Sequence, residues 1–114
     1  MAKRNLIPGT LDLMVLRTVL TGGTQHGYGI ARFIEKTSGD ELQLNQGTIY
    51  ASLIRLKRRG WIESQWGISA NNRKANFYEV TKLGRRRLFA ATRQWEWLSN
   101  LMDRVLGLGK VSSR

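Results

Sequence analysis

Apolar side chains recur at helical spacing through the first part of the chain. A helix is predicted from Leu11 to Gly22-Gly23, after a break at Pro8-Gly9-Thr10 in which Thr10 is a candidate N-cap. A second helix is predicted from His26-Gly27-Tyr28 to Ser38-Gly39, again with apolar positions on one face. The pattern therefore begins with two short amphipathic helices.

A third helix is predicted to begin near Asn45, a suitable N-cap residue, and to continue to Gly60. Its apolar residues Ile49, Leu53 and Leu56 fall at i, i+4 and i+7. This spacing puts them on one face, which indicates a helix with a single buried stripe.

The hydrophobic period then changes from helical to alternating. Residues 61–66 alternate like a short strand, residues 67–73 have the composition of a turn, and residues 75–80 indicate a returning strand. Thr81 is a good N-cap for a last helix that reaches Leu106. Residues 107–114 form a polar tail.

Three helices, a hairpin and a long helix indicate a mainly α fold with a small β-hairpin (α+β). We expect a winged helix-turn-helix plus a long C-terminal dimerisation helix. At 114 residues the chain has room for one core. The expected organisation is a DNA-binding unit over residues 1–80, a dimerisation helix over 81–106 packed on it, and a flexible tail over 107–114.

The charge is strongly basic, with a formal net charge of +11. Residues 55–93 hold most of it, with eleven basic residues against Glu63 and Glu79. Such a balance favours a polyanionic partner, either nucleic acid or an anionic membrane. The triplet at residues 85–87 could contact flanking phosphates or be merely solvated.

The third helix presents small and cationic residues opposite its buried stripe. At about 100° per residue from Ile49, Gly47, Ala51, Arg55 and Arg58 point outward, and Thr48 and Ser52 lie on one flank. Small side chains let a helix enter the major groove, where hydroxyls and guanidinium groups meet phosphates and bases. The alternative is an ordinary solvated face. The candidate DNA-contacting residues here are Gln46, Gly47, Thr48, Tyr50, Ala51, Ser52, Arg55 and Arg58.

The tip of the predicted hairpin ends in two cations. Asn72, Arg73 and Lys74 are candidate DNA contacts, since a wing can place arginine in a minor groove. An ordinary polar turn explains the same residues.

The last helix carries an apolar seam with 3-4-3-4-3 spacing, typical of paired helices. So small a domain cannot bury this seam, so we expect a homodimer, with the first helix contributing to the interface. The predicted interface residues are Leu11, Val15, Leu88, Ala91, Trp95, Leu98, Met102 and Val105. Trp95 and Trp97 are either packing residues or the walls of a pocket for a small aromatic effector.

The sequence gives little support for a catalytic site or a metal site. The chain has one histidine and no cysteine, and its eight carboxylates show no convincing pairing, so neither a cofactor nor a metal is expected. His26, at a helix start, is better suited to capping. No apolar run approaches the roughly 20 residues of a membrane span, and no signal-peptide pattern follows the basic start, so we expect a cytoplasmic protein.

Several blocks resemble the PadR family of bacterial transcription regulators, in that family's order. They are residues 8–13 (PGTLDL), 26–31 (HGYGIA), 46–50 (QGTIY), 53–56 (LIRL), 59–62 (RGWI), 71–75 (NNRKA) and 78–84 (YEVTKLG). The resemblance spans roughly residues 6 to 106. Within the family, the chain is similar to the short subfamily with one C-terminal helix. Relatives often have proline where this chain has Ala51, a change expected to alter contacts rather than fold.

The resemblance implies a homodimeric repressor that binds a dyad-symmetric DNA operator in the nucleoid, catalyses nothing, and in some relatives is released by small phenolic or amphipathic compounds. Two other functions fit the charge: a non-specific architectural nucleic-acid binder, whose electrostatic affinity ignores sequence, and a peripheral membrane protein. The membrane interpretation is weaker because the cations of the last helix gather at one end.

Overall fold

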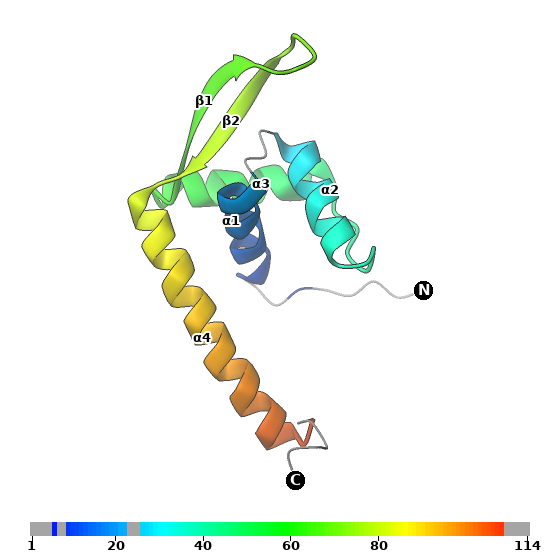
Figure 1. Cartoon of the computed structure of the whole chain (residues 1–114), viewed down its shortest axis with the longest axis vertical. Coiled ribbons are helices and arrows are strands. Elements are labelled where there is room, and N and C mark those ends of the chain that lie inside the picture. Colours follow the sequence, from blue (N-terminus) through cyan, green and yellow to red (C-terminus); the bar gives the residue numbers. More distant parts are fainter. Residues whose placement is uncertain (1–5, 7–8, 23–25, 109–114) are drawn as a thin grey trace.

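The computed structural model describes residues 6, 9–22 and 26–108, and over them the chain forms four helices and one two-stranded antiparallel sheet (Figure 1). The elements, in chain order, are α1 (Thr10–Gly22), α2 (Gly27–Thr37), α3 (Gln46–Arg58), β1 (Ile62–Ile68), β2 (Lys74–Val80) and α4 (Lys82–Leu106). The predicted fold class is confirmed. The basic start, the break at Pro8 and the tail beyond Leu108 lie outside the described residues.

Side-chain caps fix the starts of three helices. The Asn45 side chain accepts a hydrogen bond from the Thr48 amide at 2.8 Å, and the Thr81 hydroxyl accepts one from the Gly84 amide at 3.0 Å. The predicted N-caps Asn45 and Thr81 are confirmed, whereas Thr10, the third candidate, lies inside α1 as its first residue. His26 caps α2 in the same way, with Nδ1 accepting from the Gly29 amide at 3.3 Å. The one histidine is therefore used in local structure.

The core lies where α1, α2 and α3 meet. The predicted stripe of α3 is confirmed, because Ile49, Leu53 and Leu56 are all buried. α1 and α2 contribute the other large side chains, chiefly Leu16 and Ile30. Burying an aliphatic side chain of this size stabilises the fold by roughly 1.5–3 kcal/mol. This core holds α3 in place with one face turned outward.

The hairpin grows from the end of α3. Gly60, with a φ of +78°, turns the chain out of the helix, and Ile62 pairs with Val80 at the buried base of the sheet. Both strands are longer than predicted, so residues 69–73 alone form the tip. Trp61, Phe77 and Tyr78 are partly buried, whereas Trp66 on β1 is 63% exposed.

α4 begins against the hairpin and runs away from the helical body (Figure 1). Thr81 binds the preceding turn, donating its hydroxyl hydrogen to the Gly60 carbonyl at 2.7 Å and its amide to the Trp61 carbonyl at 3.0 Å. A Cβ at Gly84 would collide with the Trp61 carbonyl oxygen, so only glycine allows this close approach. The first turns of α4 are thus docked tightly.

Two residues predicted for a dimer interface are instead buried in the protomer. Val15 is fully buried in the core between α1 and its neighbours, and Leu88 is 4% exposed where α4 passes the body. Neither side chain is accessible to a second copy in this conformation. That part of the prediction is wrong, because the start of α4 packs on its own domain and uses the first position of the seam.

Candidate nucleic-acid interface

The outward face of α3 is open and small at its N-terminal end. Gly47, Thr48, Ala51 and Arg58 are all exposed, as the helical rotation from Ile49 predicts. The Thr48 hydroxyl donates to the Asn45 side chain at 3.0 Å and keeps lone pairs for an outside donor. Among the described residues, Arg58 has no side-chain partner. This face can approach a groove closely.

Tyr50 lies on the other flank, 44% exposed, and contacts neighbouring elements. A Cβ at Gly27 would lie 3.5 Å from its ring, so Tyr50 packs over the start of α2. It also lies near Tyr78 on β2, where burial first and the Tyr50 phenol second raise the pKa of the Tyr78 hydroxyl. Tyr50 thus connects the helix-turn-helix with the hairpin.

Ser52 was predicted to face DNA, and the structure contradicts this. Its side chain is fully buried, and its hydroxyl donates to Oδ1 of Asp12 at 2.7 Å. The flank of α3 that holds Ser52 is covered by α1, so what a helical projection places at the edge of the exposed face is an interior position.

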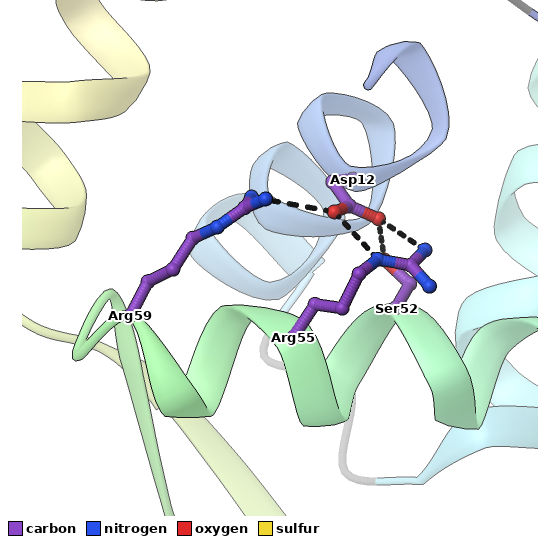
Figure 2. A network of polar contacts seen from close by, with 4 residues as sticks. All are labelled: Asp12, Ser52, Arg55 and Arg59. Carbon is purple, nitrogen blue, oxygen red and sulfur yellow. Dashed lines mark hydrogen bonds and ion pairs between the residues drawn. The ribbon is translucent and has the colours of Figure 1, made fainter. Parts of the chain in front are cut away.

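The carboxylate of Asp12 on α1 binds two arginines at the C-terminal end of α3 (Figure 2). Arg55 binds it with both ends of the guanidinium: Nε lies 2.9 Å from Oδ2 and Nη2 lies 2.7 Å from Oδ1. Arg59 adds a longer contact from Nη1 to Oδ2 at 3.4 Å. The paired geometry of Arg55 is the stronger kind of ion pair.

This network favours the ionised carboxylate. Burial alone would raise the pKa of Asp12, but the hydrogen bonds from Arg55 and Ser52 outweigh it. The charges of Arg55 and Arg59 act in the same direction, so the pKa of Asp12 is lowered. The hydrogen bond to Asp12 in turn raises the pKa of Arg55. Arg55 stays charged and half-exposed, and Asp12 holds its orientation.

Neither Asp12 nor Arg59 was predicted from the sequence as part of the site. A signal was present: Asp12 precedes Val15, Leu16 and Val19 by three, four and seven residues, which places a carboxylate on the buried face of a helix. A buried carboxylate requires a partner, and the neighbouring helix supplies it.

The hairpin tip carries the predicted cations outward. Asn72 adopts a φ of +60°, which asparagine tolerates well, and its amide donates to the Ser69 carbonyl at 2.9 Å. Arg73 and Lys74 are exposed, and the Lys74 ammonium lies 5.7 Å from the centre of the Trp66 ring. All eleven basic side chains between residues 55 and 93 are exposed.

The outer part of α4 leaves large apolar side chains exposed. Trp95 is 48% exposed and Val105 71%, and on the same helix Met102 is 43% and Leu98 37% exposed. Trp95 and Trp97 are two residues apart and so point to different sides of α4. One protomer therefore does not bring them together in one pocket.

Metal and membrane features are lacking in the part of the chain that the structure describes. Within it, no three His, Cys, Asp or Glu side chains gather in a way that could hold a metal ion. None of the helices described there has the length and apolarity to cross a bilayer.

Solved transcriptional regulators share this fold. One from Streptococcus matches with a TM-score of 0.76 and 24% identity, over 90% of this chain and 97% of that one. A PadR-like regulator from Bacillus cereus matches with a TM-score of 0.74 and 22% identity, over 90% and 95%. At these identities the likeness establishes the fold alone.

Sequence comparison also identifies the family. An uncharacterized protein of Lysinibacillus sphaericus is 28% identical over 103 residues, which are 90% of this chain and 94% of that protein. The model of the transcriptional regulator PadR-like family matches residues 15–90, a span that includes α2, α3, the whole hairpin and the docked start of α4. The chain therefore belongs to the PadR-like family of transcriptional regulators, and it is a DNA-binding transcription regulator.

Proposed function

We propose that this protein is a homodimeric repressor that occupies a dyad-symmetric DNA operator in the cytoplasm, at the nucleoid, and is released by a small aromatic effector. Each protomer inserts α3 into a major groove and lays its hairpin in the flanking minor groove. The two recognition helices of a dimer then read half-sites about 34 Å apart.

The observation that carries this proposal is the open face of α3 beside a cationic wing. Gly47, Thr48 and Ala51 allow a close approach to base edges, and Arg58 extends the same face with a guanidinium that no other described residue binds. The proposed DNA contacts, without the buried Ser52, are Gln46, Gly47, Thr48, Tyr50, Ala51, Arg55, Arg58, Asn72, Arg73 and Lys74.

Arg55 has fewer free hydrogen-bond donors for DNA than Arg58. Asp12 accepts hydrogen bonds from Nε and Nη2, so both N–H groups of Nη1 and the second N–H of Nη2 are left to bind a phosphate. Arg58 has no such constraint. We therefore expect Arg58 to contribute to base recognition and Arg55 to phosphate binding, which fixes register without reading sequence.

We also propose a division of the chain into three parts. Residues 1–80 form the DNA-binding unit, residues 81–106 the dimerisation helix, and residues 107–114 a tail. The dimer forms through the exposed apolar side of α4, with a contribution from the half-buried Leu11 of α1. The interface residues on α4 are Ala91, Trp95, Leu98, Met102 and Val105.

The effector site is placed between protomers. Trp95 and Trp97 diverge on one helix, so an aromatic pocket needs the helix of a second copy to close it. A flat apolar compound stacked there would alter the spacing of the two recognition helices. Simple packing of both tryptophans in the dimer is the competing interpretation, and quenching of tryptophan fluorescence by planar compounds separates the two.

The test is binding to a duplex containing the promoter region upstream of the gene, against a scrambled duplex, at about 50 and 200 mM salt. We expect a preference of about 10³-fold or more and a steep fall with salt. Arg58→Ala and Arg73→Ala should each weaken promoter binding about tenfold, and Arg58→Ala should also reduce the preference. Gln43→Ala, an exposed position before α3, serves as the control.

Repression itself is tested with a reporter fused to the same promoter. Expression of the protein should lower reporter output, and Arg58→Ala should restore it. Equal binding to both duplexes would instead indicate a non-specific architectural binder, and increased reporter output would indicate an activator.

A further inference from the structure

The two faces of the hairpin differ in chemistry. Side chains directly opposite each other in the register share a face, and faces alternate along each strand. The inner face continues outward from the buried pair of Ile62 and Val80. Its further members are Ser64, Trp66 and Ile68 on β1, and Lys74, Asn76 and Tyr78 on β2. The outer face holds Glu63, Gln65, Gly67, Ala75, Phe77 and Glu79.

Charge indicates which face meets DNA. Glu63 and Glu79 are direct cross-strand neighbours on the outer face, and two adjacent carboxylates repel phosphate. The inner face has no carboxylate. It carries Lys74 near the tip and receives the Lys57 ammonium of α3, which donates to the Ser64 hydroxyl at 2.8 Å. The inner face therefore suits a polyanion.

The inner face is also continuous with the recognition helix. The contact between Lys57 and Ser64 joins the end of α3 to β1, and Tyr50 lies near Tyr78 on β2. The inner face of the hairpin therefore adjoins the flank of α3 that carries Tyr50 and Lys57.

This face leaves two large apolar side chains uncovered: Ile68, which is 65% exposed, and Trp66. Trp66 is 63% exposed, and the Lys74 ammonium lies 5.7 Å from its ring centre. Phe77 on the outer face is different, because it covers Gly67: a Cβ there would lie 2.7 Å from the Phe77 ring. Phe77 is thus used within the hairpin, and the indole of Trp66 is presented outward beside a cation.

We propose that Trp66 is a DNA-contacting residue that lies in the minor groove next to the major groove entered by α3. Its indole packs on deoxyribose and base edges, and Lys74 binds an adjacent phosphate. Apolar side chains in a minor groove widen it and partly unstack a base step, which adds selectivity for deformable sequences. This inference rests on the proposed function, since it requires α3 at duplex DNA.

The experiment compares Trp66→Ala, Trp66→Phe and Gln65→Ala, the last a neighbouring exposed position on the outer face. Each is titrated with the promoter duplex and with the scrambled duplex at low salt. We expect Trp66→Ala to lose about tenfold in affinity, Trp66→Phe to recover most of it, and Gln65→Ala to bind as wild type. Because Trp66 is exposed, the melting temperature should stay unchanged in all three.

Fluorescence gives an independent readout. Added duplex should quench the tryptophan emission of the wild type, and this quenching should be lost in Trp66→Phe and kept in Trp97→Phe. Unchanged affinity in Trp66→Ala together with unchanged quenching in Trp66→Phe would overturn the inference, and the exposed indole would then belong to a protein contact.

The two proposals fail differently. If the wild type binds both duplexes equally while Trp66→Ala weakens both, sequence-specific repression is wrong and the Trp66 contact stands. If the wild type prefers the promoter and Trp66→Ala is unaffected, the repressor stands and the Trp66 contact is wrong.

Discussion

The helical body (α1, α2 and α3) buries its large apolar side chains, whereas the outer part of α4 leaves its own exposed. In the body, α1, α2 and α3 bury their apolar stripes against one another, and even the carboxylate of Asp12 finds its partners within the protomer. In α4, Leu88 is the last large side chain that is buried, and beyond it Trp95, Leu98 and Val105 are exposed. The body is complete alone, whereas α4 presents a surface suited to a second copy.

This difference predicts which property of the protein a mutation in each region should change. Changes in the body should alter folding stability, and changes on the outer part of α4 should alter association while the body stays folded. The junction at Gly84 belongs to both regions, because it fixes the direction in which α4 leaves the body.

The largest effect is expected from Leu98→Glu on the exposed side of α4. An unpaired carboxylate in an apolar interface costs on the order of 3 kcal/mol, so the dimer dissociation constant should rise about 100-fold. Sedimentation velocity over a concentration series measures this, and the thermal transition of the body should be retained.

Asn100→Glu is the matched control, since it adds the same charge on the opposite side of α4 and should leave association unchanged. A wild-type protein that sediments as a monomer at micromolar concentration would contradict the comparison itself.

A smaller loss is expected from Gly84→Ala at the junction. The added methyl group collides with the backbone oxygen of Trp61, so α4 must shift, at a cost of about 2–3 kcal/mol in the free energy of unfolding. Urea denaturation measures the loss. Gly47→Ala is the control, because its Cβ would meet only the Asn45 side-chain oxygen at 3.3 Å and its stability should change far less.

The smallest effect, and one confined to the body, is expected from Asp12→Asn. Losing the charge from this network should lower the free energy of unfolding at pH 7 by about 1–2 kcal/mol. The pKa of Asp12 is lower in the folded state than its ordinary 3.8, so its stabilisation is complete above that value and is lost as the pH falls through the folded pKa.

Urea denaturation between pH 2 and 7 tests this sign. Acid destabilisation should be weaker in Asp12→Asn than in the wild type, and Asp40→Asn, at an exposed turn, should follow the wild type. Equal acid sensitivity in the wild type and Asp12→Asn would show that the network does not favour the ionised carboxylate.

Local signals in the sequence predict much of this fold. Asn45 and Thr81 mark helix starts, and the spacing of Ile49, Leu53 and Leu56 gives the buried side of α3 correctly. These features depend on neighbours within one or two turns, so they can be read directly from the chain.

Features set by packing between elements were the ones missed. A helical projection gives the angle of Ser52 but not that α1 covers that flank, and it gives the seam of α4 but not that Leu88 docks on its own domain. The exposure of Gly47, Ala51 and Arg58 was predictable, because no described helix or strand covers that side of α3. Asp12 required knowledge of which helix it faces.

The anchoring of Thr81 and Gly84 also has a mechanical consequence. α4 has 25 residues, so at about 1.5 Å per residue it is a rod of about 37 Å fixed at one end to the turn that follows α3. A tilt of about 10° at that turn would move its far end by about 6 Å, nearly two base-pair steps of duplex. Attachment at one end, through Thr81, Gly84 and Leu88, thus makes α4 a lever, so that a small rearrangement at that end produces a larger displacement at the other.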